Sequence, residues 1–274
     1  MRFSLILPLF IVLSLIVNTV GFRRLVHFVS VGYALSVIVM SLVTGMVFLV
    51  QLPPLPPLAF LHLAGLIVWG ARLAIYVLRR EAKAAYQNRA ADMFGQYNGV
   101  SALIKLVIWV SVSILYVLMF LPALFNATNT LQMPAFVATV AQALGLVVLF
   151  GGLAIEAVAD RQKSVHKAQH PGQYCAVGLY RWVRCPNYLG EILFWLGGWI
   201  MGLPFYTTPL EWLGSLAGLL CIILIMIGST KRLERSQDAR YMSLPEYQLY
   251  VRTVPVLIPF VPIYSLKNMR VSLG

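Results

Sequence analysis

The chain has 274 residues, of which 60% are hydrophobic and 11% are charged, and its mean hydropathy is +0.82. This composition excludes an ordinary soluble globule and predicts an all-α polytopic membrane protein. A net charge of +12 would suggest a nucleic-acid partner in a soluble protein. Here the Lys and Arg residues gather in particular loops between apolar stretches, so we expect contact with membrane lipids and no nucleic acid.

Seven apolar stretches predict about seven transmembrane helices, because a helix of roughly 20 apolar residues crosses the hydrocarbon core of a bilayer. The stretches are Phe3–Val20, Phe28–Val50, Leu58–Leu78, Leu103–Leu124, Phe136–Val158, Leu189–Leu203 and Leu213–Ile227. The first has no small-x-small cleavage site after it, so we expect a retained anchor and not a signal peptide. The sixth is short.

The distribution of positive charge predicts the orientation of these helices. The loops over residues 51–57, 126–134 and 204–209 contain no Lys or Arg, whereas the alternate loops and the tail are basic. Cytosolic loops carry the excess of Lys and Arg, so we expect the N-terminus outside and the C-terminus in the cytosol. We expect an inner membrane in a bacterium or the endoplasmic reticulum in a eukaryote.

Cysteine and histidine spacing predicts neither a disulfide framework nor a metal site. Two of the three cysteines fall in a cytosolic or membrane-boundary context. Only His166 and His170 share helical spacing, and no further ligands accompany them. Asn126-Ala-Thr128 fits a glycosylation sequon, which has a meaning only in a secretory pathway.

The third apolar stretch carries a stripe of aromatic and basic side chains. They recur at three- and four-residue steps, which places on one helix face Trp69, Arg72, Tyr76, Arg80 and Lys83. A charged Arg72 within a membrane span must face the helix bundle. The stripe is either an aromatic packing face with a pairing arginine, or the lining of a cofactor channel whose basic end binds phosphate.

The segment Gly178–Glu191 passes from basic, polar residues through a proline into the sixth apolar stretch. Asn187 and Glu191 are therefore expected one turn apart at the start of a membrane helix. An acid within a membrane is costly unless it is paired, protonated or lines a cavity, which makes Glu191 a candidate functional residue. The alternative is that Glu191 pairs with Arg181 or Arg184 near the headgroups.

A second pair of carboxylates ends the fifth apolar stretch. Glu156 and Asp160 lie one turn apart, and basic residues follow at Arg161, Lys163 and Lys167. They are either salt-bridged boundary residues or a dinucleotide site, in which carboxylates accept hydrogen bonds from ribose hydroxyls or an amide and cations engage phosphates. No Gly-x-Gly-x-x-Gly motif follows a strand pattern, so helices would have to hold the cofactor.

The tail after the seventh stretch is expected to continue as a charged helix into the cytosol. A second polar helix then carries Tyr247, Tyr250 and Arg252. The apolar segment Val254–Pro262 is too short to span the membrane and contains prolines. We expect it to return to the membrane surface and to cap a cofactor pocket.

Three segments of the chain resemble the C-terminal signature of the steroid 5-alpha-reductase family and of its bacterial relatives of unknown function. They are Gly178-Leu-Tyr-Arg-x-x-Arg-x-Pro-Asn-Tyr-Leu-Gly-Glu191, Glu156-Ala-Val-Ala-Asp-Arg-Gln-Lys163 and Tyr247-Gln-Leu-Tyr-Val-Arg252. The isoprenylcysteine carboxyl methyltransferases share this layout. They are expected to have His-Pro where this chain has Cys185-Pro186, and no Asn-x-x-x-Glu pair, so the reductase side is favoured.

The resemblance implies NADPH as cofactor and a single transmembrane domain. Residues 135–274 would form the cofactor-binding half, and residues 1–125 the helices on the substrate side. Asn187 and Glu191 would hold the nicotinamide end, with Asp160 and Tyr174 at the middle of the cofactor. The other implied cofactor-binding residues are Lys163, Lys167, Arg181 and Arg252 for the phosphates, together with Arg72 and Tyr241.

The family's pattern for a steroid ketone is incomplete in this chain. Steroid reductases carry a Gln-Glu pair that holds the ketone together with a Tyr. This chain has Gln51-Leu52-Pro53, which lacks the Glu, and Trp69 stands where the Tyr is expected. The substrate class therefore stays broader than steroid ketones.

We expect an NADPH-dependent membrane oxidoreductase that reduces a carbon–carbon double bond, as in an enone, of a steroid-like or isoprenoid-like lipophilic substrate. Tyr76 is the expected proton donor, and Glu191 acts beside the cofactor. An S-adenosylmethionine-dependent membrane methyltransferase and a non-catalytic lipid-binding protein are the alternatives. The 2′-phosphate of NADPH would suit a cytosolic cluster of Arg80, Lys83, Lys163, Lys167, Arg181, Arg184 and Arg252, although positive-inside bias alone predicts the same charges.

Overall fold

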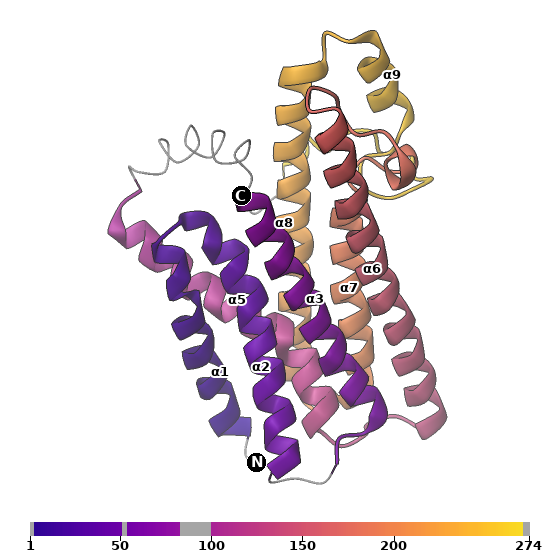
Figure 1. The fold of residues 1–274 in the computed structure, drawn as a ribbon. Coiled ribbons are helices and arrows are strands. Elements are labelled where there is room, and N and C mark those ends of the chain that lie inside the picture. The colour runs from indigo at the N-terminus through magenta and orange to yellow at the C-terminus, as the bar shows by residue number, and fades with distance from the viewer. Residues whose placement is uncertain (1–2, 51–53, 83–99, 271–274) are drawn as a thin grey trace. The chain divides into compact units, whose positions relative to one another are not determined.

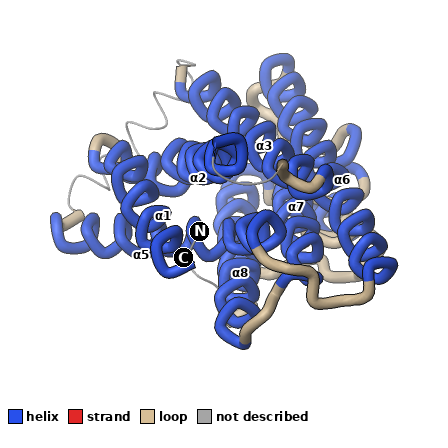
Figure 2. The backbone as a smooth tube through the Cα atoms, turned by 90° about the horizontal axis from the view of Figure 1, so that it is seen from below, coloured by secondary structure: helices blue, strands red, loops and turns tan. Residues whose placement is uncertain are grey.

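The computed structural model describes residues 3–50, 54–82 and 100–270. Within them every regular element is a helix, and Figure 2 shows these helices joined by loops and turns. Six of them are long and apolar enough to cross a membrane, and a shorter apolar helix lies near the N-terminus. The chain is therefore an all-α, multi-pass integral membrane protein, as its composition predicts. Gln51–Pro53 and Lys83 lie outside the described residues.

The contacts within the chain divide it into two compact units. Unit 1 comprises Met1–Gln142 and Met201–Gly218, and unit 2 comprises Ala143–Ile200 and Leu219–Gly274. The division does not follow chain order. The segment Met201–Gly218 belongs to unit 1 with the N-terminal helices, although the segments before and after it belong to unit 2.

Unit 1 contains the helices α1 (Phe3–Asn18), α2 (Val31–Val50), α3 (Pro57–Glu81) and α5 (Ala102–Thr128). α3 begins at Pro57, because proline fits the first turn of a helix but not its interior. α2 and α3 pack closely (Figure 1): a Cβ on Gly70 would lie 2.9 Å from the carbonyl oxygen of Ala34. Beside this contact, the ring centres of Tyr33 and Trp69 lie 4.8 Å apart.

A buried polar chain links three helices of unit 1. The side-chain amide of Asn126 lies 3.2 Å from Nδ1 of His62 and accepts a hydrogen bond from Gln142 Nε2 at 2.9 Å. Each of the three residues is less than a tenth exposed. This fold therefore leaves no room for a glycan on Asn126.

Unit 2 holds the larger parts of α6 (Ala135–Gln169), α7 (Pro186–Gly202) and α8 (Pro209–Tyr241), followed by the short α9 (Pro245–Thr253). α6 has 35 residues and α8 has 33, so at 1.5 Å per residue each is about 50 Å long against a hydrocarbon core of about 30 Å. Their charged ends continue well beyond the apolar stretches, as the sequence predicts for the tail.

Glycine residues bring α6 and α7 into backbone contact. A Cβ on Gly197 would lie 2.3 Å from the backbone N of Leu149, and one on Gly152 would lie 2.4 Å from the N of Phe194. A Cβ on Gly190 would lie 2.6 Å from the N of Glu156. Rising numbers on α6 meet falling numbers on α7, so the two helices are antiparallel, and small residues allow this close packing between membrane helices.

Candidate functional site

The signature segments, far apart in the chain, meet in unit 2. Gly178 has φ +59°, and a Cβ there would lie 2.3 Å from the side chain of Gln162. Gln162 Oε1 accepts a hydrogen bond from the backbone N–H of Leu179 at 2.9 Å. A glycine is needed at this turn because the backbone is left-handed and the amide of Gln162 fills the space beside it. These contacts tie the signature segment within α6 to the one that leads into α7.

The third signature segment joins the same core. The hydroxyl of Tyr250, on α9, donates to the carbonyl oxygen of Tyr180 at 2.8 Å. The backbone N–H groups of Arg184 and Cys185 donate to the carbonyls of Pro255 and Val256, at 2.9 and 3.0 Å. The segment after α9 therefore covers the start of α7, and its buried side chains pack there around the thiol of Cys185.

The predicted carboxylates gather at the polar end of the α6–α7 pair. α7 begins immediately before Asn187, so Asn187 and Glu191 lie one turn apart at its start. Gly190 touches the backbone of Glu156, and Asp160 lies one turn farther along α6. Glu156, Asp160 and Glu191 are 3%, 6% and 9% exposed. Two helices held by backbone contact thus present three buried acids near one another.

The side-chain oxygen of Asn187 lacks a hydrogen bond. Its Oδ1 is buried and has no hydrogen-bond partner among the residues that the structure describes. A buried amide oxygen accepts up to two hydrogen bonds, and leaving it without any costs free energy. A donor from a bound molecule would satisfy it.

Arg184 does not serve this site, contrary to the sequence-based expectation that includes it in a phosphate-binding cluster. The residue is 4% exposed. Its Nη2 lies 2.9 Å from Glu234 Oε1 and donates to the carbonyl oxygen of Tyr264 at 2.5 Å. Glu234 Oε2 accepts from the backbone N–H of Leu266 at 2.9 Å. Arg184 therefore fastens the C-terminal segment to α8. Its ion-pair partner is Glu234, whereas the sequence suggested Glu191 as a possible partner.

Four tyrosines form a cluster beyond the polar end of α6. The ring of Tyr174 lies 5.0 to 5.8 Å from the rings of Tyr241, Tyr247 and Tyr250. Lys167 Nζ donates to the hydroxyl of Tyr241 at 3.0 Å. Burial raises the pKa of Tyr174, Tyr247 and Tyr250 above the ordinary phenol value. These phenols therefore stay neutral at physiological pH.

The remaining predicted cations differ in exposure. Lys163 is half-buried on α6, one turn after the carboxylates, whereas Arg181 is exposed at the end of the 3-10 turn Gly178–Arg181. Arg252 is exposed on α9 and lines a groove of about 260 Å³. Across this groove Lys267 pairs with Asp238. Arg252 has no ion pair within the described chain, so it is the cation of the groove that is open to an anion.

Arg72 and Tyr76 belong to unit 1, where both are half-buried on α3. The Arg80 guanidinium lies 5.7 Å from the centre of the Tyr76 ring, so the polar stripe forms one face as its spacing predicts. The other predicted site residues belong to unit 2: Asp160, Lys163, Lys167, Tyr174, Arg181, Asn187, Glu191, Tyr241 and Arg252.

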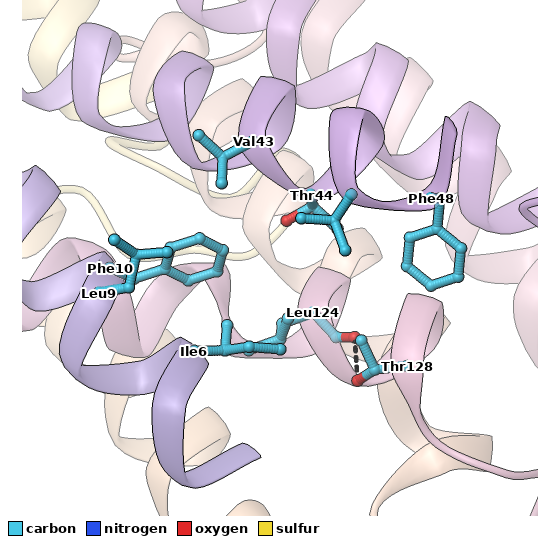
Figure 3. Close-up of a pocket in the computed structure, with 9 residues that line it drawn as sticks. Ile6, Leu9, Phe10, Val43, Thr44, Phe48, Leu124 and Thr128 are labelled. Carbon is cyan, nitrogen blue, oxygen red and sulfur yellow. Dashed lines mark hydrogen bonds between the residues drawn. The ribbon is translucent and has the colours of Figure 1, made fainter. Parts of the chain in front are cut away.

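Unit 1 has an apolar pocket of its own, of about 20 Å³, between α1, α2 and α5 (Figure 3). Its lining is Ile6, Leu9, Phe10, Val43, Thr44, Val47, Phe48, Leu124 and Thr128. The hydroxyls of Thr44 and Thr128 each donate at 2.8 Å to a carbonyl of their own helix, so the lining offers hydrocarbon alone. The pocket lies at the end of α2, whereas Tyr76 lies beyond Gly70, which packs near the beginning of α2.

Sequence reasoning did not assign roles to Gln162 and Glu234. Gln162 stands within a signature segment, and the left-handed glycine it supports is the signal that could have found it. Glu234 pairs with a residue 50 positions away, and no local spacing shows such a partner. No group of three or more His, Cys, Asp or Glu side chains in the described ranges is placed to hold a metal ion.

No curated protein and no solved structure matches the chain. A family whose description is "Protein of unknown function (DUF1295)" matches residues 21–254. That range contains all three signature segments and every residue predicted for the site. The chain belongs to this family of proteins of unknown function.

Proposed function

We propose that the chain is a membrane-embedded, NADPH-dependent reductase of a carbon–carbon double bond, conjugated to a carbonyl group, in a steroid-like or isoprenoid-like lipophilic substrate. The observation that carries the proposal is the gathering of Asp160, Asn187 and Glu191 at the polar end of the α6–α7 pair. The resemblance of the three signature segments to the steroid 5-alpha-reductase family supports it. When bound, NADPH would supply the hydride that adds to the β-carbon of the double bond.

The polar groups at this end of unit 2 suit the nicotinamide half of a dinucleotide. The buried Asn187 Oδ1 needs a donor, and the carboxamide of a nicotinamide ring has one. Glu191 and Asp160 carry carboxylates that accept hydrogen bonds from an amide or from ribose hydroxyls. Tyr174, whose neutral hydroxyl both donates and accepts, would lie along the middle of the cofactor.

The cations of unit 2 would meet the phosphates. Lys163 and Lys167 follow Asp160 on α6, and Arg252 lines the open groove. Arg181 is exposed and can engage a phosphate without losing a buried partner. Arg184 has no part in this set, because Glu234 neutralises it. Charge-assisted hydrogen bonds to phosphate are the strong ones in protein sites.

The substrate side of the proposal falls on unit 1. Tyr76 is the proposed donor of the proton that reaches the α-carbon, which completes the two-electron reduction together with the hydride. Arg72, one turn before Tyr76 on the stripe, would line the same channel.

The proposal is tested by thermal unfolding of the purified protein with NADPH, with NADH, with S-adenosylmethionine and without addition, because a ligand that binds the folded state raises its unfolding temperature. NADPH is expected to stabilise the protein, and Glu191→Gln is expected to fold normally and to lose most of that stabilisation. Glu246→Gln is the matched control, since Glu246 is an exposed acid of the same unit. It should respond to NADPH as the unchanged protein does.

Each other outcome refutes the proposal in a definite way. Stabilisation by S-adenosylmethionine alone would assign the protein to the methyltransferases, and stabilisation by none of the three would favour a lipid-binding protein without catalysis. NADPH should bind about tenfold or more tightly than NADH, because one charge-assisted contact to the 2′-phosphate contributes roughly 1.5–3 kcal/mol. Equal affinity at low and high salt would leave membrane topology as the reason for the cations.

A further inference from the structure

Unit 2 exposes a cluster of large apolar side chains outside its helices. Trp182, before α7, is 60% exposed, and Phe260, after α9, is 83% exposed. Their ring centres lie 5.9 Å apart. Ile258 and Val261, on the same turn as Phe260, are 47% and 37% exposed. We call these four residues the apolar tip.

The apolar tip is held in place by backbone hydrogen bonds. The N–H of Val256 donates to the carbonyl of Ile263 at 2.9 Å, and the N–H of Ile263 donates to that of Val261 at 2.7 Å. These bonds close the turn that carries Phe260. Phe260 has φ +64°, a left-handed conformation that is uncommon for a residue with a large side chain. The turn therefore holds the ring of Phe260 outward, 83% exposed, at a cost in backbone energy.

The apolar tip lies where the chain enters the membrane. Trp182 precedes Pro186, the first residue of the span in α7, by four residues, and four residues reach at most about 14 Å. The backbone of Val256 is paired with that of Cys185, immediately before the same proline. Both halves of the apolar tip are thus anchored within a few residues of the start of a membrane helix.

A bilayer provides the environment that such a group requires. Trp and other aromatic residues are enriched at the level of the headgroups, where an apolar ring leaves water while polar atoms stay hydrated. We propose that the apolar tip inserts into the boundary between headgroups and acyl chains of the bilayer that the helices cross, so that its partner is lipid.

The experiment reads the depth of residue 260 in vesicles of phosphatidylcholine and phosphatidylglycerol. A nitroxide is attached at Phe260→Cys in a chain that also carries Cys221→Ser, because the other two thiols, of Cys175 and Cys185, are buried. Collisions of the nitroxide with oxygen, which concentrates in hydrocarbon, are compared with collisions with a water-soluble nickel chelate. Met242→Cys is the control: it is exposed and apolar, but it lies 15 residues beyond Ile227, the end of the last apolar stretch, or roughly 22 Å along a helix.

The label at residue 260 is expected to collide more often with oxygen, and the label at residue 242 more often with the nickel chelate. Equal access of the chelate to both positions would overturn the proposal, because the apolar tip would then lie in water. Shielding of residue 260 from both reagents would overturn it as well, since a protein surface would then cover the tip. Ile258→Cys repeats the measurement at a second position of the turn, and its label must show the same preference for oxygen.

Discussion

Glu234→Gln is a sharp test of how the C-terminal segment is held. The substitution keeps the shape of the side chain and leaves an oxygen for the backbone N–H of Leu266, but it removes the negative charge that faces Arg184. The side chains of Glu234 and Arg184 are 2% and 3% exposed, with a distance of 2.9 Å between Oε1 and Nη2. The guanidinium would therefore stay buried without a counter-ion.

The size of the effect follows from this burial. Removing one partner of a buried ion pair typically destabilises a protein by about 3–5 kcal/mol, because the remaining charge is left uncompensated. A domain of this size changes its unfolding temperature by about 2–4 °C per kcal/mol, so the expected decrease is about 6–20 °C. Exposed pairs contribute only about 0–1 kcal/mol.

The chain offers a matched control in Lys267→Ala. Lys267 and Asp238 also join the C-terminal segment to α8, but their side chains are 35% and 17% exposed. Asp238 keeps the hydrogen bond at 2.9 Å from the hydroxyl of Tyr247 after the change. Unfolding of the two variants in the same detergent should separate them clearly. If Glu234→Gln loses no more than Lys267→Ala, burial does not control the strength of these pairs and the reasoning is wrong.

Three further predictions concern packing, thiol chemistry and topology. Gly190→Ala should destabilise the protein, because the new Cβ meets the backbone of α6 at 2.6 Å, whereas Gly151→Ala, with nothing within 4 Å, should be neutral or stabilising in a thermal melt. Burial raises the pKa of Cys185 from 9.0 to about 12, so its thiol should resist maleimide at pH 8 until the protein unfolds. The neutral thiol is then favoured in the folded state, and this contribution to stability should disappear as the pH rises from 9.0 toward 12. Reporters fused after His170 should lie in the cytosol and those after Thr128 on the opposite side, and a cytosolic signal at Thr128 would contradict the predicted orientation.

Hydropathy and the positions of prolines predicted the membrane helices. All seven apolar stretches form helices, and α3, α7, α8 and α9 each begin at a proline. Hydropathy did not predict the full lengths of these helices. The fifth apolar stretch ends at Val158, whereas α6 continues to Gln169, because hydropathy falls where a helix leaves the lipid although its backbone hydrogen bonds continue. Two halves were predicted, but the grouping of Met201–Gly218 with the N-terminal helices was not, since it depends on contacts between distant segments.

The candidate site was predicted only where local spacing determines it. Asn187 and Glu191 share the start of α7, and Glu156 and Asp160 share one face of α6, which follows from helical periodicity. The partner of Arg184 was beyond such reasoning, because Glu234 lies on another helix. Charge counting included Arg184 among the phosphate ligands for the same reason: a sequence shows that a residue is basic but does not show that it is already neutralised.

The contact between α6 and α7 connects the fold of unit 2 with its candidate site. Gly190, which touches the backbone of Glu156, is the residue immediately before Glu191. The separation of the acids on the two helices is therefore fixed by backbone packing and does not depend on a ligand, so little ordering should accompany binding. Two kinds of variant then have different effects: Gly190→Ala should lower stability and cofactor binding together, whereas Glu191→Gln should lower binding alone. A loss of stability in Glu191→Gln as large as that in Gly190→Ala would mean that the acid serves the helix contact and not a bound molecule.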